Sequence, residues 1–165
     1  MIEIPFDACK VRDAAKPLEY AHEGDSGIDV YVAAVSVKPF KEDLVCEEYS
    51  IYPGDTVLVK TGWHVAIPKG TEFQCRPTSG NSLKTAIRIC NSPGTIDSNY
   101  RGEIGVIVQN TGDETIKLKQ GAKIAQIVLC PVYKGVPHYV DTVEELGQTN
   151  RGADGYGSTG TILNK

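Results

Sequence analysis

The chain has 165 residues, a length that suits one domain with a tail, and its composition is that of an ordinary folded protein. Lysine and arginine number 17 against 21 aspartate and glutamate, and the net charge of -4 argues against a nucleic-acid or membrane-surface protein. No apolar run is long enough to span a bilayer, and the N-terminus lacks the pattern of a signal peptide. The five cysteines are scattered and odd in number, which indicates buried, reduced thiols in a cytosolic protein.

Short stretches of alternating apolar and polar residues recur along the chain, separated by glycine and proline. This period of two predicts antiparallel strands, because successive side chains of a strand face opposite sides of the sheet. The apolar members, in chain order, are Ile2, Ile4 and Phe6, then Val57 and Val59, Val65 and Ile67, Ile104, Val106 and Val108, and Ile116 and Leu118. The pattern predicts an all-β sandwich, barrel or jelly roll, with short helices only at residues 79–84 and 143–146.

Two segments depart from this pattern. Residues 38–48 are charged and lack alternation, so we expect a surface insertion within a hairpin. Residues 147–165 hold five glycines and few large apolar side chains, too few to offset the entropy lost on ordering. We therefore expect one domain over residues 1–146 and a flexible arm over 147–165. A disordered tail is the common outcome for such a segment, yet its glycines, hydroxyls and Arg151 also suit a phosphate.

Residues 91–103 are typical of a strand, a turn and a second strand, with polar groups around the turn. Asn91 and the nearby backbone suit the edge of a base, and Asp97 suits a general base that activates water. An aspartate in a turn more commonly caps that turn, and Tyr100 either stacks on a ligand or covers the sheet. The residues alone leave both roles open.

Three other segments carry polar residues beside expected strands. Ser79 suits either a helix cap or a phosphate ligand, because both roles use the same free N–H groups. Asp25 and Asp29 suit either a polar turn or a cation held through water, and Gln126 lies in an apolar strand where it needs hydrogen-bond partners. The three histidines lie far apart, and the sequence has no nucleophile elbow, Walker loop or Rossmann fingerprint.

Taken together and in this order, five segments closely resemble the five motifs of the trimeric dUTP pyrophosphatases, or dUTPases. They are residues 25–29 (DSGID), 76–84 (RPTSGNSLK), 94–103 (GTIDSNYRGE), 121–128 (GAKIAQIV) and 151–160 (RGADGYGSTG). Residues 61–70 also resemble the family's framework, so the resemblance extends over almost the whole chain from about residue 10. It implies a jelly roll of the β-clip type with one short helix, assembled as a homotrimer with its active sites at subunit interfaces.

The resemblance also implies Mg²⁺-dependent hydrolysis of dUTP to dUMP and pyrophosphate, which removes dUTP from the nucleotide pool and supplies a dTTP precursor. Asp97 matches the acid that activates the attacking water, and Gln126 matches the residue that holds that water or a phosphate. Asp29 matches the acid that reaches the metal through water. The matches to the uracil and deoxyribose pocket are Asn91, Gly94, Thr95, Ile96, Tyr100 and Tyr156. The expected phosphate ligands are Arg76, Ser79, Gly80, Gln126, Arg151, Gly157, Ser158 and Thr159.

Within that pocket, Tyr100 matches the ring beneath the sugar, which leaves no room for a 2′-hydroxyl, and Tyr156 matches the aromatic residue that covers uracil. The chain departs from the family pattern at three positions. Thr78 stands where an arginine usually precedes Ser79, Tyr156 replaces a phenylalanine, and Asn99 replaces an acid. Arg76, two residues before Thr78, either compensates for the missing arginine or does not.

Two rival interpretations share the fold. A dCTP deaminase, or a bifunctional deaminase and dUTPase, needs an acid on the strand after the hairpin, where this chain has Gln109. A dUTP-gated regulatory protein needs no catalysis, whereas Asp97, Gln126 and Arg151 favour retained catalysis. We expect dUTP and further copies of the chain as partners, and neither nucleic acid nor membrane. The expected location is the cytoplasm, or the host cytoplasm if a phage encodes the chain.

Overall fold

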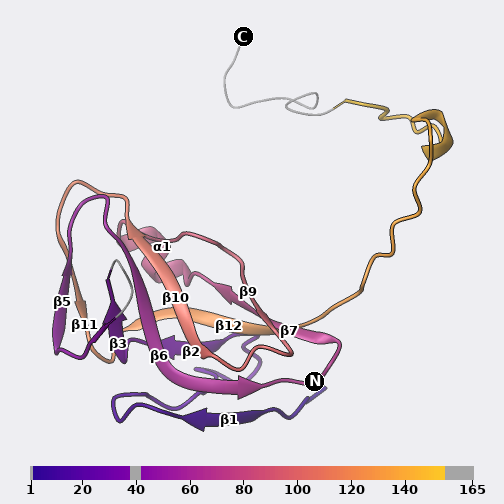
Figure 1. Cartoon of the computed structure of the whole chain (residues 1–165). Helices are drawn as coiled ribbons and strands as arrows, with labels where there is room; N and C mark the ends of the chain where they lie inside the picture. The colour runs from indigo at the N-terminus through magenta and orange to yellow at the C-terminus, as the bar shows by residue number, and fades with distance from the viewer. Residues whose placement is uncertain (1, 38–41, 155–165) are drawn as a thin grey trace. The chain divides into compact units, whose positions relative to one another are not determined.

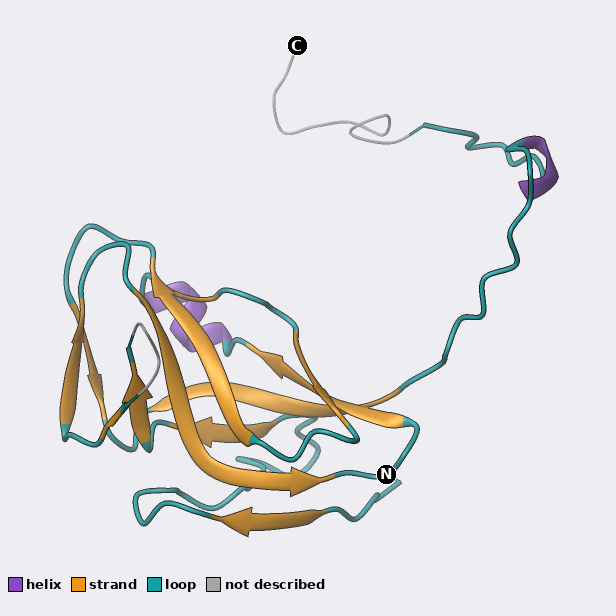
Figure 2. Ribbon diagram, viewed as in Figure 1, coloured by secondary structure: helices purple, strands orange, loops and turns teal. Residues whose placement is uncertain are grey.

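The structure is a computed structural model that describes residues 2–37 and 42–154. Strands dominate it, as Figure 2 shows. The elements in chain order are β1 (Asp7–Lys10), β2 (Ile28–Tyr31), β3 (Ala34–Ser36), β4 (Asp43–Leu44), β5 (Glu48–Ile51), β6 (Thr56–Ala66), β7 (Thr71–Arg76), α1 (Ser79–Lys84), β8 (Ile87–Ile89), β9 (Gly94–Asp97), β10 (Glu103–Asn110), β11 (Ile116–Lys119), β12 (Lys123–Pro131) and η1 (Glu144–Leu146).

Two sheets and a ribbon form the body of the protein, which ends at Tyr133 (Figure 1). The larger sheet has the strand order β4-β3-β6-β10-β8, and β1 also pairs with β6. The smaller sheet has the order β2-β12-β7-β9, while β5 and β11 form the separate ribbon. The all-β, jelly-roll-like prediction is confirmed, and among the described residues neither sheet closes into a barrel.

The core lies between the sheets and is built by the alternation that the sequence shows. In β6, Val57, Val59 and Val65 are buried while their neighbours are partly exposed, and the smaller sheet contributes Phe73 and Ile127. Each large apolar side chain removed from water in this way stabilises the fold by about 1.5–3 kcal/mol. The same burial therefore fixes which side chains of each strand remain on the outer faces, where the candidate site lies.

The N-terminal segment differs from the prediction. Ile2, Ile4 and Phe6 do not form a strand, because it is the next four residues, Asp7–Lys10, that pair with residues 63–66 of β6. Ile2 is 90% exposed, and only Phe6 packs inward, edge-on against Phe73 with 5.1 Å between ring centroids. All four residues of β1 are exposed, so this strand has no apolar alternation by which the sequence could have located it.

The strands before and after residues 38–41, β3 and β4, form a hairpin, as expected. β3 and β4 are antiparallel, with Val35 opposite Leu44 and Ser36 opposite Asp43. Residues 38–41 lie outside the described residues. No sequence pattern predicts β4, because a strand of two exposed residues shows no apolar alternation.

All five cysteines are unpaired; three of them are exposed, and Cys130 is only partly buried. Cys75 lies in the core, where burial raises the pKa of its thiol to about 11. Cys9, Cys46 and Cys90 are exposed, so the prediction of buried thiols was wrong for these residues. Cys9, for example, belongs to a strand that packs no side chain into the core.

The body is followed by a second unit, which begins at Lys134. It contains η1, a single turn of 3-10 helix, within the second window in which the sequence predicted a helix. Every residue from 147 to 154 is exposed. Contacts between residues separate the two units after Tyr133, whereas the sequence predicted that the arm starts at Gly147. The boundary between residues 146 and 147 stays a prediction.

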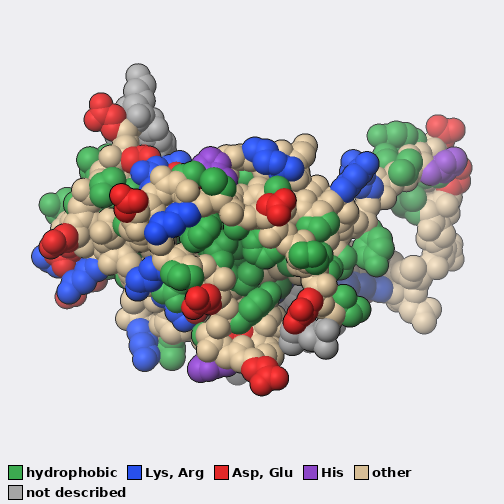
Figure 3. Space-filling view, turned by 90° about the horizontal axis from the view of Figure 1, so that it is seen from below, with side chains coloured by type: hydrophobic (Ala, Val, Ile, Leu, Met, Phe, Trp, Pro, Cys, Tyr) green, Lys and Arg blue, Asp and Glu red, His purple; other side chains and the backbone are tan. Residues whose placement is uncertain are grey.

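On the face shown in Figure 3, acidic and basic side chains are interspersed, with apolar side chains between them. This face therefore lacks the single-sign positive surface that binding to nucleic acid favours. None of the helices in residues 2–37 and 42–154 combines the length and the apolar character that crossing a membrane requires.

Candidate active site

β9 and the turn that connects it to β10 carry the first group of predicted site residues. The sequence predicted a hairpin here, but β9 pairs with β7 whereas β10 pairs with β6 and β8, so this β9–β10 turn connects the two sheets. β9 lies at the end of the smaller sheet and pairs only with β7 among the described strands, so its outer edge has backbone N–H and C=O groups free for a ligand. The amide of Asn91 lies against Gly94: a Cβ at Gly94 would come within 3.1 Å of the Asn91 Nδ2 atom. Because Gly94 has no side chain, the amide of Asn91 can lie close against the backbone at the start of β9.

Beside β9 and the β9–β10 turn lies a hollow of about 140 Å³. Its lining residues are Thr95, Ile96, Asp97, Tyr100, Ile104 and Gly105. Ile96 and Ile104 are buried, while Thr95, Asp97 and Tyr100 are exposed, so an apolar floor meets a polar rim. A space of this size holds about one six-membered ring.

The β9–β10 turn is held by hydrogen bonds within it. The N–H of Tyr100 donates to the carbonyl of Asp97 over 3.0 Å, and the Tyr100 hydroxyl donates to the carbonyl of Glu103 over 3.2 Å. Among the described residues, the Asp97 carboxylate has no hydrogen-bond partner and does not cap the turn. This arrangement leaves an exposed carboxylate and a half-exposed aromatic ring at the rim of one hollow.

The second group lies in a row across three neighbouring strands of the smaller sheet. Gln126 of β12 is opposite Asp29 of β2 on one side and opposite Arg76 of β7 on the other. The Gln126 amide donates to the carbonyl of Pro77 over 3.1 Å, and a Cβ at Gly27 would lie 2.3 Å from its Oε1 atom. Gln126 therefore contacts the loops that follow β7 and precede β2, which provides the partners that the sequence indicated it needs.

Asp29 is buried and pairs with Lys123, whose Nζ lies 2.5 Å from Asp29 Oδ2. Chiefly through this hydrogen bond, the pKa of Lys123 is raised above its usual value. The sequence prediction missed Lys123 as a site residue, although it stands in the fourth motif-like segment. No group of three or more metal-ligating side chains occurs in the described part of the chain. A single carboxylate acting through water suits Mg²⁺ that is held mainly by phosphate oxygens.

The first turn of α1 presents the expected phosphate ligands Ser79 and Gly80, both exposed. The residue that caps the helix is Thr78, whose hydroxyl accepts from the N–H of Asn81 over 3.4 Å, so a capping role for Ser79 was wrong. The threonine that replaces the family's arginine thus has a structural use. The Arg76 guanidinium is held by Gln74 Oε1, at 2.6 and 3.2 Å, and its contact with a phosphate stays a prediction.

One copy of the chain does not bring the two groups together. Asp97 is opposite Glu72, whereas Gln126 is opposite Arg76, four residues further along β7. At the usual rise of a strand, this offset separates the two side chains by about 13 Å along the sheet. A general base and the residue that holds its water must both lie within hydrogen-bond reach of that water. Asp97 and Gln126 cannot meet this requirement within one copy.

The arm supplies the remaining predicted residues. Arg151 is exposed, and its Nε donates to the carbonyl of Asp154 over 2.8 Å. Tyr156, Gly157, Ser158 and Thr159 lie outside the described residues. Their roles stay predictions.

Comparisons with known proteins identify the family of the chain. The dUTPase family model matches residues 13–160. The chain is 45% identical to the deoxyuridine 5′-triphosphate nucleotidohydrolase of Picosynechococcus sp., over 87% of this chain and 89% of that protein. It is 38% identical to the protein of the same name from Clostridium tetani, over 97% of this chain and 99% of that protein.

Solved structures show the same fold. The dUTPase of Staphylococcus bacteriophage 80alpha with dUPNHPP aligns with a TM-score of 0.77 and 24% identity, over 95% of this chain and 99% of that chain. The dUTPase from phage phi11 of S. aureus aligns with a TM-score of 0.70 and 23% identity, over 85% of this chain and 98% of that chain. With the family model matching most of its length and relatives this similar, the chain belongs to the dUTPase family.

Proposed function

We propose that this chain hydrolyses dUTP to dUMP and pyrophosphate, and so removes dUTP from the nucleotide pool. The observation that carries the proposal is the hollow of about 140 Å³ beside the β9 edge, with Asp97 and Tyr100 at its rim. A ring-sized space next to free backbone groups suits uracil, which offers both hydrogen-bond donors and acceptors. The names of the curated relatives support the same substrate.

In the proposed reaction, Asp97 accepts a proton from a water that attacks the α-phosphorus in line with the leaving pyrophosphate. No covalent nucleophile is needed, which agrees with the exposed carboxylate at the hollow. Gln126 orients that water or an α-phosphate oxygen through the part of its amide that Pro77 does not hold. Asp29, through water, and the phosphate oxygens would hold Mg²⁺, which would supply neutralisation of the charge on the triphosphate.

We further propose that the active enzyme is a homotrimer in which each site combines the β9–β10 turn of one copy with Asp29, Gln126 and Arg76 of another. The offset of about 13 Å between Asp97 and Gln126 within one copy supports this assembly. A symmetric ring of three copies would complete three such sites. Light scattering at micromolar concentration tests the assembly, and a fully active monomer would contradict it.

The arm, which we place at residues 147–165, closes over the bound nucleotide in this proposal. Arg151 would clamp the triphosphate with Ser158 and Thr159, and Tyr156 would stack on the base. Arg151 is exposed and its guanidinium forms a contact only within the arm itself among the described residues, so it is available to a phosphate. Closure would exclude water from the phosphates and strengthen each charge contact.

The decisive experiment is a pyrophosphate-release assay with dUTP, dCTP, dTTP and UTP, each with Mg²⁺ and with EDTA. We expect Mg²⁺-dependent turnover of dUTP, and turnover of dCTP at least about a hundredfold slower, because cytosine would leave polar groups of the pocket unpaired. Ammonia release from dCTP would instead identify a deaminase. Equal turnover of dCTP and dUTP, or no turnover of dUTP, would overturn the proposal.

A further inference from the structure

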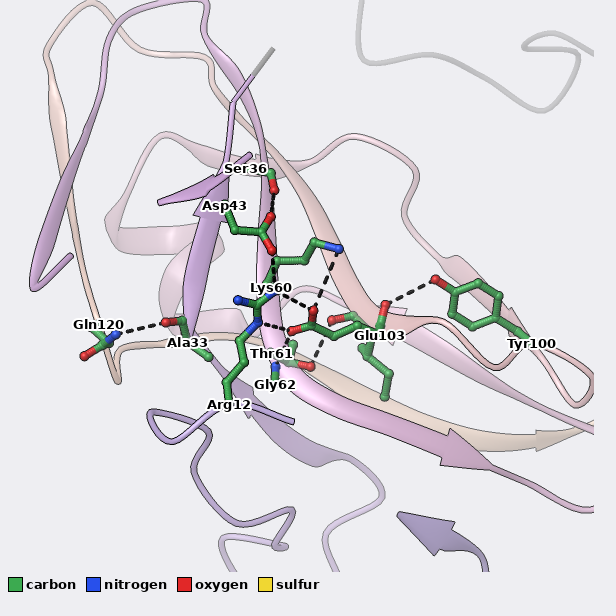
Figure 4. Close-up of polar contacts among 11 residues, drawn as sticks. Arg12, Ala33, Ser36, Asp43, Lys60, Thr61, Gly62, Tyr100, Glu103 and Gln120 are labelled. Carbon is green, nitrogen blue, oxygen red and sulfur yellow. Dashed lines mark hydrogen bonds and ion pairs between the residues drawn. The ribbon is translucent and has the colours of Figure 1, made fainter. Parts of the chain in front are cut away.

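A network of polar and charged side chains outside the hollow connects four parts of the chain that lie apart in the sequence (Figure 4). Arg12 Nε and Nη2 donate to the two oxygens of Glu103 over 2.7 and 2.8 Å, and Nη2 also donates to Asp43. Ser36 donates to Asp43, and Lys60 Nζ lies 3.8 Å from Glu103. The Glu103 side chain is only 8% exposed, so solvent screens its ion pair weakly.

Glu103 also completes the hydrogen bonding of β6 and β10 where their register shifts. The shift lies between Glu103 and Gly105. There the N–H of Gly62 donates to the Glu103 carboxylate over 2.8 Å, and the Thr61 hydroxyl donates to the carbonyl of Ile104 over 2.9 Å. Side chains thus replace backbone partners at this point of the ladder, and the position of the first residue of β10 depends on them.

Glu103, the first residue of β10, holds the ring of Tyr100 in the β9–β10 turn. The Tyr100 hydroxyl donates to the Glu103 carbonyl over 3.2 Å, and the ring covers Gly102, where a Cβ would lie 2.1 Å from the hydroxyl oxygen. The Tyr100 N–H in turn bonds the Asp97 carbonyl. A displacement of Glu103 therefore reaches both residues at the rim of the hollow.

We propose that Arg12 and Glu103 are positioning residues that set the place of Tyr100 under the sugar, and that Asp43 of the β3–β4 hairpin orients Arg12 for this task. The inference rests on the proposed function, because it uses the sugar site of dUTP. Arginine suits the position, since its planar fork can grip both carboxylate oxygens of Glu103 while the same group also meets Asp43. Lysine offers a single point charge and cannot hold all three oxygens in fixed directions.

The proposal predicts a specific loss. Tyr100 is expected to exclude a 2′-hydroxyl by lying close beneath the sugar, so a looser Tyr100 admits UTP more readily. The effect falls on the ratio of kcat/KM for dUTP to kcat/KM for UTP, and not only on overall activity. Because misplacement by about 1 Å can change a rate a hundredfold, we expect this ratio to fall about tenfold when the Arg12–Glu103 pair is weakened.

The test compares Arg12→Lys, Glu103→Gln and Asp43→Asn with the parent full-length chain, using both substrates. Glu48→Gln is the matched control, because it also removes one carboxylate from an ion pair, with Lys117 at 2.6 Å, on the β5–β11 ribbon. We expect the ratio to fall about tenfold for Arg12→Lys and Glu103→Gln, to fall less for Asp43→Asn, and to stay at the parental value for Glu48→Gln. Calorimetric titration with a non-hydrolysable dUTP analogue gives the binding part of each change.

The outcomes separate the inference from the function on which it rests. If the parent does not turn over dUTP, the proposed function fails. If the parent is active and folded Arg12→Lys and Glu103→Gln keep the parental ratio, the positioning role is overturned. A Glu103→Gln chain that does not fold shifts the decision to Arg12→Lys, which keeps the charge, and to Asp43→Asn, which keeps the Arg12–Glu103 pair. An equal loss of ratio in Glu48→Gln would also overturn the inference.

Discussion

Two carboxylates six residues apart, Asp97 and Glu103, lie in opposite surroundings. Asp97 is exposed at the rim of the hollow, and no described residue hydrogen-bonds to its carboxylate. Glu103 is almost enclosed and is held by Arg12, Lys60 and the N–H of Gly62. Surroundings decide what a carboxylate can do. The free one can take a proton from water, whereas the held one is a structural anchor.

Replacing Asp97 with asparagine removes the base and keeps its size. We expect kcat for dUTP to fall by at least about a hundredfold, while KM changes little. Steady-state kinetics with purified chain, together with binding of a non-hydrolysable analogue, would check this split. Turnover within a few-fold of the parent would show that Asp97 is not the base.

The anchor predicts a dependence of stability on pH. Burial opposes the ionisation of Glu103, but the hydrogen bonds from Arg12 and Gly62 and the charges of Arg12 and Lys60 outweigh it, so the pKa of this carboxyl lies below its usual 4.5. A carboxyl with a lowered pKa in the folded state stabilises the protein above its unfolded pKa and loses this contribution as the pH falls through the folded value.

We therefore expect the free energy of unfolding to decrease as the pH falls below about 4.5, in part through Glu103. Glu103→Gln removes this group and should flatten the decrease in urea titrations at several pH values. A parental slope in the folded variant would contradict the assignment.

At the scale of elements, one glycine of β6 contacts both the N-terminal segment and the start of β10. Gly62 has φ of 81°, and its carbonyl accepts from the N–H of Val11 over 2.8 Å. A Cβ there would lie 2.5 Å from Ala15 Cβ and 3.1 Å from Arg12 Cβ. The close approach places Arg12 beside Glu103, so the glycine serves the network as well as the strand.

Gly62→Ala should destabilise the chain through both backbone strain and this overlap. Gly54→Ala is the matched control, since Gly54 has φ of 82° and a Cβ placed on it would have no neighbouring atom within 4 Å. We expect Gly54→Ala to lower the free energy of unfolding by about 1 kcal/mol and Gly62→Ala by about 2 kcal/mol more. Equal losses in denaturant titrations would show that the overlap relaxes freely.

The strands that enter the core could be predicted because burial imposes a period that the sequence displays. The helix at residues 79–84 buries no residue, so no burial period marks it. β1 and β4 could not, since none of their residues is buried. Asp97, Gln126 and Asp29 were found through motif-like segments. The Arg12–Glu103 pair spans 91 residues, and no local pattern signals such a partner. Likewise, Ser79 was predicted as a possible helix cap because sequence alone does not show which of two adjacent hydroxyl residues caps the helix.

At the scale of the whole molecule, the body and the chain beyond it differ in how they are held. The body contains the core, whereas every residue from 147 to 154 is exposed. An arm of this kind adds little to the free energy of unfolding. Its contribution is expected in the reaction, where closure would neutralise charge on the phosphates.

A stop codon at Asn150 should therefore leave the melting temperature nearly unchanged and lower kcat for dUTP by at least about tenfold. Arg151→Ala is the milder form and should lower kcat less. Calorimetry and steady-state kinetics on the same preparations check both. A truncated chain that hydrolyses dUTP at the parental rate would refute the role of the arm, and one that does not fold would show that these residues are structural.

Because Asp97 and Gln126 of one copy lie too far apart to share a site, two inactive variants should complement each other within a mixed trimer. In the proposed ring of three, each site would take Asp97 from one copy and Gln126 from its neighbour. Any trimer that mixes Asp97→Asn chains with Gln126→Ala chains then contains a single interface at which both parental residues meet. Refolding the two in equal amounts should restore roughly a quarter of the parental activity, whereas mixing Asp97→Asn with Asp97→Ala should restore none. Failure of the first mixture, with mixed trimers confirmed by mass spectrometry, would place both residues of a site on the same chain.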